Sequence, residues 1–441
     1  MKDFAISEDP AVQAQLDRLG ALSLPQGRLG LDTVRELCRR LGNPQDRLPP
    51  VFHVAGTNGK GSTCTYLRFM LEAQGLKVHT ATKPHLVRYN ERIRLAGELI
   101  SDGLLADLLK EALDAASNPD LGPDLEPSFF EVTTAALFLA FARVPADVCV
   151  IETGLGGRLD ATNILAASAC SGLATLGLDH EAFLLSPDPA LPQEPLARIA
   201  FEKASIAKPG CPLVTLSYPA LAMETVRATA QAHEAPLFAR GQAWDARIDD
   251  AIHYHDARGT LMLPLPTLAG THQAENAALA VAMLRHQSAV AITPEAMAAG
   301  IRAARWPARL QRLGEGPLTA RVPGRTVWLD GGHNPDAGLA IARHLAAQPP
   351  VHVIIGMLAN KDPSAILGPL GTHALSISVV PAPGHDAHRP EDLAAHSALP
   401  VRSFADVDQA LAALPTQGDV LIVGSLYLAG DVLRRNGEVP D

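Results

Sequence analysis

The stretch that decides the fold is VFHVAGTNGKGS, at residues 51–62. Its first five residues form a short apolar run, which predicts a buried strand. The glycines after it let the backbone turn tightly, so that successive N–H groups face one anion, and a helix predicted over 61–74 adds positive potential at its N-terminus. The lysine supplies a full charge for phosphate. The predicted phosphate loop comprises Gly56, Thr57, Asn58, Gly59, Lys60, Gly61 and Ser62.

The spacing of this loop differs from the ordinary G-x-x-x-x-G-K-[ST] pattern, because Gly61 follows the lysine and Ser62 comes one position later. This spacing argues against a P-loop GTPase or kinase. The alternative is a glycine-rich turn between a strand and a helix that binds no ligand. The strand, the helix and the lysine together favour the phosphate-binding interpretation.

Apolar runs alternate with helical patterns along the first 304 residues. This alternation is typical of a parallel sheet covered by helices on both faces. We therefore predict an α/β fold with a doubly wound, mostly parallel sheet that contains the phosphate loop. The segment 244–263 departs from the rhythm and predicts a small antiparallel excursion. Strands are expected at 77–82, 147–151, 170–176 and 212–216, and helices at 102–116, 130–143, 273–286 and 294–304.

A stretch rich in Pro, Arg and Gly at 306–324 predicts a domain junction. After it a second α/β rhythm begins, which predicts a smaller Rossmann-like domain. We place the two domains at 1–304 and 305–441. Strands of the second domain are expected at 327–329, 351–355, 375–380 and 420–423.

Composition and charge narrow the class of protein. The chain has 441 residues, and its formal charge of −10 argues against a general nucleic-acid binder. The longest apolar stretch, 135–142, is far shorter than the ~20 residues that span a bilayer. The first ten residues contain no apolar segment of a signal peptide. The five cysteines are scattered and lack a C-x-x-C pair, which is typical of reduced thiols. We expect a cytoplasmic protein with neither nucleic-acid nor membrane partners.

Several polar residues follow predicted strands, where ligands bind in doubly wound folds. Glu152 ends one strand, and its carboxylate suits Mg²⁺ that bridges nucleotide phosphates. Taken alone, it could equally cap a helix or pair with a lysine. His180 follows the next strand; a lone histidine is more often a satisfied polar residue than a ligand. Asp330 and His333 follow the strand 327–329, where caps and a turn are the alternative interpretation.

Taken together, these motifs resemble the folylpolyglutamate synthase/dihydrofolate synthase family of ATP-dependent amide ligases, which is related to the muramyl peptide ligases. The resemblance runs from about His53 to Leu428. It rests on HVAGTNGKGST, PHLVRYNERI, FFEVTTAALF, VIETGLGGRLDATNI, LDHEAFL, EKASI, ENAALA, WPARLQ, LDGGHNPDA, IIGMLANKD and GSLYLAG.

The resemblance implies a bifunctional ligase. ATP would phosphorylate a carboxylate to an acyl phosphate, and the amino group of L-glutamate would displace the phosphate to form an amide. The acceptor would be dihydropteroate or a reduced folate. The alternatives are a muramyl-type peptide ligase, which the GLGGRLDATN segment disfavours, and a non-catalytic nucleotide-binding homologue.

The resemblance also implies roles for individual residues. The phosphate loop would hold ATP, with Mg²⁺ at two sites and a C-terminal domain that binds glutamate and closes on the nucleotide; we expect a monomer. Lys60, Lys203, Asp330 and His333 would be catalytic; Asn276, Arg309 and Asp330 would contact the nucleotide; Glu152, His180 and Lys203 (as a carbamate) would bind metal; Ser128, Phe129, Phe130, Glu131, Arg158, Leu159 and Asp160 would bind the pterin substrate.

Lys83 departs from the family pattern. The family usually has a serine before Pro-His-Leu, and the hydroxyl of that serine helps to hold a magnesium ion. A protonated lysine cannot ligate Mg²⁺. We therefore hypothesise that Lys83 replaces part of the charge of the metal.

Overall fold

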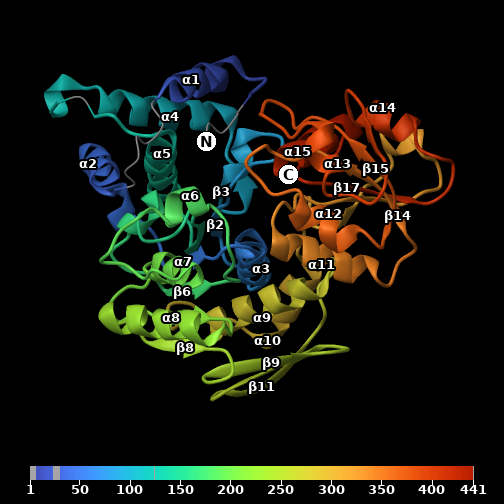
Figure 1. Ribbon diagram of the computed structural model, residues 1–441. Coiled ribbons are helices and arrows are strands. Elements are labelled where there is room, and N and C mark those ends of the chain that lie inside the picture. The colour runs from blue at the N-terminus through green and yellow to red at the C-terminus, as the bar shows by residue number, and fades with distance from the viewer. Residues whose placement is uncertain (1–5, 23–29, 124, 441) are drawn as a thin grey trace. The chain divides into compact units, whose positions relative to one another are not determined.

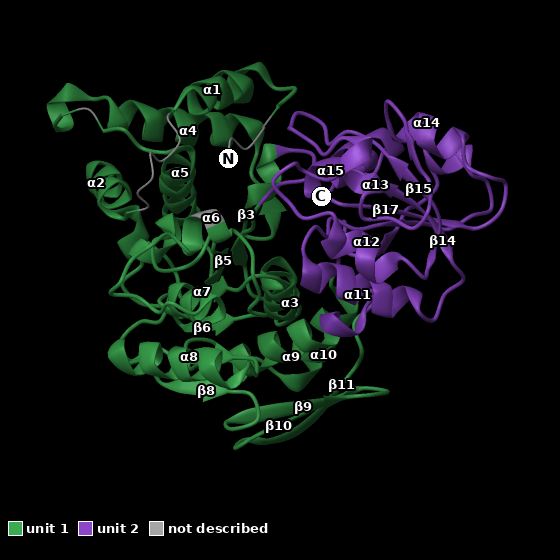
Figure 2. Cartoon of the chain, viewed as in Figure 1, with its two compact units in different colours: residues 1–83, 89–266, 274–304 green, residues 84–88, 267–273, 305–441 purple. Residues whose placement is uncertain are grey.

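The structure, a computed structural model, describes residues 6–22, 30–123 and 125–440 and forms two compact units (Figure 2). The expectation for the first ten residues therefore falls partly outside the described residues. Unit 1 lies within 1–83, 89–266 and 274–304, and unit 2 within 84–88, 267–273 and 305–441.

Two short segments, 84–88 and 267–273, belong to unit 2, although the sequence prediction placed them in the domain 1–304. The reason is apolar packing. Leu86 and Val87 pack against one hydrophobic cluster of unit 2, and Ala269 packs against the other.

Unit 1 is built on an eight-stranded sheet in the order β4-β3-β2-β5-β1-β6-β7-β8 (Figure 1). All neighbouring strands are parallel except at one edge, where β3 runs antiparallel to β2 and to β4. The mostly parallel sheet predicted for this part of the chain is confirmed. The strands are β1 (Val51–Ala55), β2 (Val78–Ala81), β3 (Ile93–Leu95), β4 (Glu98–Leu99), β5 (Val148–Glu152), β6 (Cys170–Leu173), β7 (Leu213–Thr215) and β8 (Leu237–Ala239).

The central strands of this sheet are buried on both faces, which is why their sequences are continuous apolar runs. On β5, Cys149 and Ile151 belong to the hydrophobic cluster formed with α4 and α5, whereas the helix α3 packs along β1, β2 and β5. The helices of unit 1 are α1 (Pro10–Ala21), α2 (Asp32–Arg40), α3 (Lys60–Ala73), α4 (Asp102–Ala116), α5 (Phe129–Arg143), α6 (Glu181–Leu184), α7 (Pro195–Ala204), α8 (Ala220–Ala232), α9 (Thr271–Arg285, from Ala274 onward) and α10 (Pro294–Ala303).

The excursion predicted for 244–263 is confirmed as an antiparallel sheet of β9 (Trp244–Ile248), β10 (Ile252–Asp256) and β11 (Gly259–Leu263). It lies below α9 and α10 in the view of Figure 1. All five cysteines are free thiols, as predicted. Within the described residues, no helix combines the length and the apolar character needed to cross a membrane.

Unit 2 has a six-stranded sheet in the order β12-β13-β17-β14-β15-β16, in which only β12 is antiparallel to its neighbour. Alternate residues point into two hydrophobic clusters on opposite faces: Val420 and Ile422 face one cluster, and Leu421 and Val423 face the other. The elements are β12 (Gln311–Arg312), β13 (Val327–Leu329), β14 (Val351–Ile355), β15 (Ala374–Val379), β16 (Val401–Ser403), β17 (Asp419–Val423), α11 (Pro335–Leu345), α12 (Ser364–Leu370), α13 (Pro390–Ala394), α14 (Val407–Ala412) and α15 (Leu426–Asn436).

Candidate active site

Four parallel strands of unit 1 end at the same edge of the sheet. The register pairs Ala81 of β2 with Ile151 of β5, and Val54 of β1 with Glu152 of β5. It also pairs Ala55 of β1 with Leu173 of β6. The phosphate loop follows β1, Lys83 follows β2, and Glu152 is the last residue of β5. Strands β2 and β5 lie on one side of β1, and β6, β7 and β8 lie on the other side. The strand order therefore reverses at β1, and a doubly wound fold binds its ligand at the carboxyl ends of the strands at such a point.

The phosphate loop has the backbone that the sequence predicts. Gly59 adopts a left-handed conformation with φ +82°, and α3 begins at Lys60 without a side-chain cap on its first N–H groups. The Nζ atom of Lys60 turns back to donate to the carbonyl oxygens of Gly56 (3.0 Å) and Thr57 (3.1 Å). An uncapped helix N-terminus with a lysine beside it is suited to bind phosphate.

The loop is joined to the segment that follows β6. Thr57 donates from its hydroxyl to the carbonyl oxygen of Gly177 (2.9 Å), and its backbone N–H donates to Thr175 (2.7 Å). These bonds bring the segment that leads to Asp179 and His180 onto the phosphate loop.

Asn276 on α9 also contacts the phosphate loop. Its side chain is buried, and a Cβ atom on Gly59 would lie well under 3.0 Å from its Oδ1 atom. Only glycine therefore fits at this point of the loop, because the amide of Asn276 occupies the space of a side chain.

Lys203 on α7 is buried and donates from Nζ to the carbonyl oxygen of Gly56 (2.9 Å). Burial, together with the nearby charge of Lys60, lowers the pKa of Lys203 to about 7, although Asp179 and Asp160 oppose the shift. The lysine is thus part of the site, although its sequence pattern alone is typical of a solvated surface residue.

Glu152 is buried at the end of β5, and its Oε2 atom accepts a hydrogen bond from the backbone N–H of Lys83 (3.0 Å). Burial raises the pKa of the Cys64 thiol on α3; Glu152 raises it further and Lys60 opposes the shift. Glu152 and Lys60 therefore both lie close enough to Cys64 to change the pKa of its thiol, which is consistent with a carboxylate and a cation in one site.

His180 adopts a left-handed backbone conformation with φ 54° at the start of the short helix α6. Its Nε2 atom lies 3.9 Å from Oδ2 of Asp179, and about a third of its side chain is exposed. Asp179 is an acidic residue of this segment that the predicted site residues omit.

The loop GLGGRLDATN folds around Asp160. The buried carboxylate of Asp160 accepts hydrogen bonds from the backbone N–H groups of Gly154 (2.7 Å), Leu155 (3.0 Å) and Thr162 (3.0 Å), and from the Thr162 hydroxyl (2.5 Å). Burial alone would raise the pKa of Asp160, but the Lys83 cation and these hydrogen bonds hold it below its usual range. Asp160 therefore shapes the loop.

The other predicted substrate residues have structural partners in unit 1. Ser128 caps α5, and Glu131 returns the bond as a capping box. Arg158 pairs with the buried carboxylate of Glu202 on α7 (2.9 Å). Phe129 packs against the core, together with Leu159, and Phe130 is about a third exposed at 36%.

In unit 2, Asp330 follows β13 and joins two turns. Its buried carboxylate accepts from the N–H groups of Leu310 (2.8 Å) and Gly332 (2.7 Å), and burial raises its pKa although Arg309 opposes the shift. The Nδ1 atom of His333 lies 3.0 Å from the carbonyl oxygen of Gly331. Asn334 caps α11, since its side chain accepts a hydrogen bond from the backbone N–H of Ala337.

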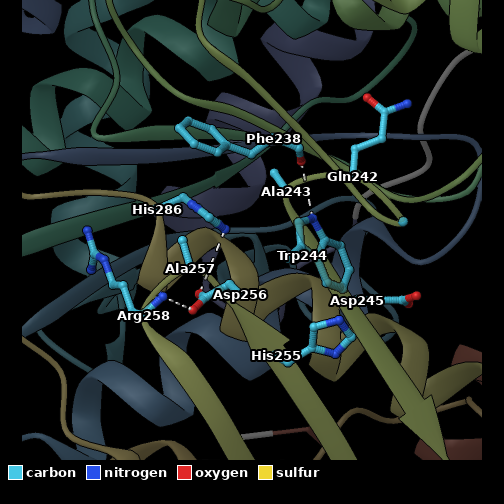
Figure 3. A pocket seen from close by; sticks show the side chains of 11 residues that line it. Phe238, Gln242, Ala243, Trp244, Asp245, His255, Asp256, Ala257, Arg258 and His286 are labelled. Atoms are coloured by element: carbon cyan, nitrogen blue, oxygen red, sulfur yellow. Dashed lines mark hydrogen bonds and ion pairs between the residues drawn. The ribbon is translucent and has the colours of Figure 1, made fainter.

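A pocket of about 640 Å³ lies elsewhere in unit 1, between β8, the β9–β11 sheet and the end of α9 (Figure 3). The ring of Phe238 stacks on His286 there, with centroids 4.3 Å apart. None of the site residues predicted from the sequence lines this pocket, so the pocket is not part of the candidate site.

Comparison with known proteins decides the family. Residues 308–426 match the family model described as Mur ligase, glutamate ligase domain. The dihydrofolate synthase/folylpolyglutamate synthase of Escherichia coli (strain K12) is 34% identical over 423 residues, covering 93% of this chain and 93% of that protein. This chain belongs to the folylpolyglutamate synthase/dihydrofolate synthase family.

Solved structures of the family share the fold. The E. coli FolC structure in complex with DHPP and ADP has a TM-score of 0.82 and 32% identity, and the match covers 97% of both chains. A bifunctional folylpolyglutamate synthase/dihydrofolate synthase with Mn, AMPPNP and L-glutamate bound has a TM-score of 0.81 and 30% identity, covering 98% of this chain and 99% of that one. The α/β fold class predicted from the sequence is confirmed.

The donor set of this family member fits a divalent cation at Glu152. Mg²⁺ prefers oxygen ligands and is usually held by one or two carboxylates together with phosphates and water. Glu152 offers one buried carboxylate beside the phosphate loop. Lys203 fits only after it loses its proton, which a pKa of about 7 permits near neutral pH.

Proposed function

We infer that this chain is an ATP-dependent ligase that joins L-glutamate to dihydropteroate and to reduced folates. The observation that carries this conclusion is the convergence of the phosphate loop, Lys60, Glu152 and Lys203 at one edge of the parallel sheet. Relatives named for both activities, of which the E. coli protein is one, support the bifunctional assignment.

The reaction has two steps. An oxygen of the acceptor carboxylate attacks the γ-phosphorus of ATP, so that ADP leaves and an acyl phosphate forms. The amino nitrogen of L-glutamate then attacks the acyl carbon, phosphate leaves with the bonding electrons, and the amine loses a proton. Both steps bring anionic oxygens together and therefore need neutralising charge.

The residues of unit 1 supply much of this charge. The N–H groups at the start of α3 and the Lys60 ammonium would hold the β- and γ-phosphates. Asn276 keeps the loop in shape through its contact with Gly59. Arg158, positioned by Glu202, and the loop around Asp160 would face the pterin substrate.

Glu152 and His180 would hold Mg²⁺, which when bound neutralises phosphate charge. Lys203 is proposed to carry a carbamate: its neutral amine would add to CO₂ and lose a proton, which puts an anion beside the metal in place of the lysine cation. In unit 2, we propose that Arg309, Asp330 and His333 contact the nucleotide. The monomeric state and the cytoplasmic location remain predictions.

The test is an assay of ADP formation with ATP, Mg²⁺ and L-glutamate, offering dihydropteroate and tetrahydrofolate separately. We expect turnover with both acceptors and its loss in Lys60→Ala. Lys110→Ala is the matched control, because Lys110 is exposed on α4 and pairs only with its helix neighbour Asp114 among the described residues. Turnover with neither acceptor would refute the function, and ATP binding without turnover would favour a non-catalytic homologue.

A further inference from the structure

Lys83 is held in a fixed position at the candidate site. It follows β2, which lies beside β5, and its backbone N–H donates to Oε2 of Glu152 (3.0 Å). The carboxylate that is proposed to bind metal thus also anchors the backbone of the lysine. The side chain of Lys83 therefore begins within the site.

The ammonium group of Lys83 lies beside the loop that follows Glu152. Its Nζ atom lies 3.5 Å from the position that a Cβ atom on Gly154 would take, and Oδ2 of Asp160 lies 3.3 Å from the same position. The charge of Lys83 lowers the pKa of Asp160 and that of the buried His53. The lysine therefore brings a cation close to the buried carboxylate of Asp160.

The charge of Lys83 is nevertheless available to a ligand. Among the residues that the structure describes, its Nζ atom forms no hydrogen bond or ion pair. Asp160 feels this charge without bonding to it, because backbone N–H groups and the Thr162 hydroxyl supply the hydrogen bonds of that carboxylate. Lys60 and Lys203 differ from Lys83, since both donate to the carbonyl oxygen of Gly56.

We propose that Lys83 is a fixed cation for the phosphoryl group under transfer, and that it takes the place of a second divalent ion. This inference rests on the proposed function. A partly buried ammonium beside Gly154 and Asp160 repels a metal ion from the same volume and cannot ligate it. The Lys83 charge stays in place and neutralises the phosphoryl oxygens both in ATP and in the acyl phosphate. It adds no covalent step. The nucleotide complex therefore holds one divalent cation per chain.

The number of metal ions tests the proposal directly. Mn²⁺ is titrated into the full-length protein saturated with AMPPNP, and bound Mn²⁺ is counted by electron paramagnetic resonance. We expect one Mn²⁺ per chain for the wild type and for Lys83→Arg. We expect two for Lys83→Ser, because the serine hydroxyl and Glu152 then offer the oxygen ligands that such ions prefer. Lys110→Ser is the matched control and should retain one.

Kinetics supply the second readout. Lys83→Met should lower kcat by about 10²–10³-fold, the effect of removing one electrostatic contact to the transition state, with a smaller change in the KM for ATP. High Mg²⁺ should restore part of the kcat of Lys83→Ser but not that of Lys83→Met. Two Mn²⁺ per wild-type chain, or unchanged kcat in both variants, would overturn the proposal. Circular dichroism of each variant checks that it is folded.

The outcomes separate this proposal from the proposed function. One Mn²⁺ per chain without any ligation would refute the function, and with it the role of Lys83 in phosphoryl transfer, while Lys83 would still be the group that excludes a second ion. Ligation with two Mn²⁺ per wild-type chain would refute the role of Lys83 alone. A wild-type protein that does not bind AMPPNP would refute both.

Discussion

Replacing Gly59 by alanine tests whether the phosphate loop depends on its close approach to Asn276. The left-handed backbone at φ +82° costs an alanine about 1 kcal/mol. The new Cβ atom would lie well under 3.0 Å from Oδ1 of Asn276, and crowding of this kind costs about 1–3 kcal/mol. We expect Gly59→Ala to lower the free energy of unfolding by about 2–4 kcal/mol. Displacement of the loop should weaken AMPPNP binding by about tenfold or more, which corresponds to 1.4 kcal/mol.

Gly75→Ala is the matched control, because Gly75 has φ +89° and no atom within 4 Å of the added Cβ position. Urea unfolding followed by circular dichroism gives the free energies, and isothermal titration calorimetry with AMPPNP gives the affinities. Gly75→Ala should show only the backbone cost of about 1 kcal/mol and normal binding. Adding Asn276→Ala to Gly59→Ala should recover the crowding cost. Equal losses in the two glycine variants would refute the reasoning.

Three further substitutions test unit 1. Burial lowers the pKa of His53 to about 3, with Lys83 contributing and Asp160 opposing. Below the ordinary histidine pKa of about 6.5, His53 is therefore protonated in the unfolded chain but not in the folded one. The free energy of unfolding should decrease as the pH is lowered, by up to about 1.4 kcal/mol per pH unit. His53→Gln should flatten this dependence in urea unfolding between about pH 5 and 7. Ser128→Ala removes the cap of α5 and should lower the unfolding free energy by about 1 kcal/mol; an unchanged urea midpoint would contradict the cap. Arg158→Ala leaves the buried Glu202 carboxylate with Arg198, 3.4 Å away, and should cost about 1–3 kcal/mol by urea unfolding, a loss that Glu202→Gln should partly reverse.

Much of the fold follows from apolar runs in the sequence. The strands predicted at 51–55, 327–329 and 351–355 have the bounds of β1, β13 and β14, because strands buried on both faces need uninterrupted apolar residues. The edge strands β8 and β16 were not predicted. Both are short and only partly buried. β8 has just the three apolar residues Leu237–Ala239, and β16 reads Val401-Arg402-Ser403, so neither has the apolar run of about 4–8 residues that marks a buried strand.

The candidate site likewise contains some residues that a local sequence pattern marks and others that no local pattern marks. Glu152 and the phosphate loop are recognisable because a strand end and a glycine-rich turn are local patterns. The bond from Lys203 to the carbonyl oxygen of Gly56 joins residues 147 positions apart, so no local pattern marks it. The role of Asp160 as the acceptor that folds its own loop is also invisible in the sequence, since it depends on which N–H groups point inward.

The composition of unit 2 from three separate parts of the chain constrains how the protein is made. Residues 84–88 leave the ribosome long before the main part of unit 2, yet the backbone of Gly430 packs directly on Leu86 within that unit. Thr267 likewise accepts a hydrogen bond from Arg305 (2.9 Å). Unit 2 therefore cannot finish folding until synthesis has reached α15, and a fragment that begins at Arg305 would expose the surface where Leu86 belongs. Expression of the C-terminal part alone should give an aggregation-prone product.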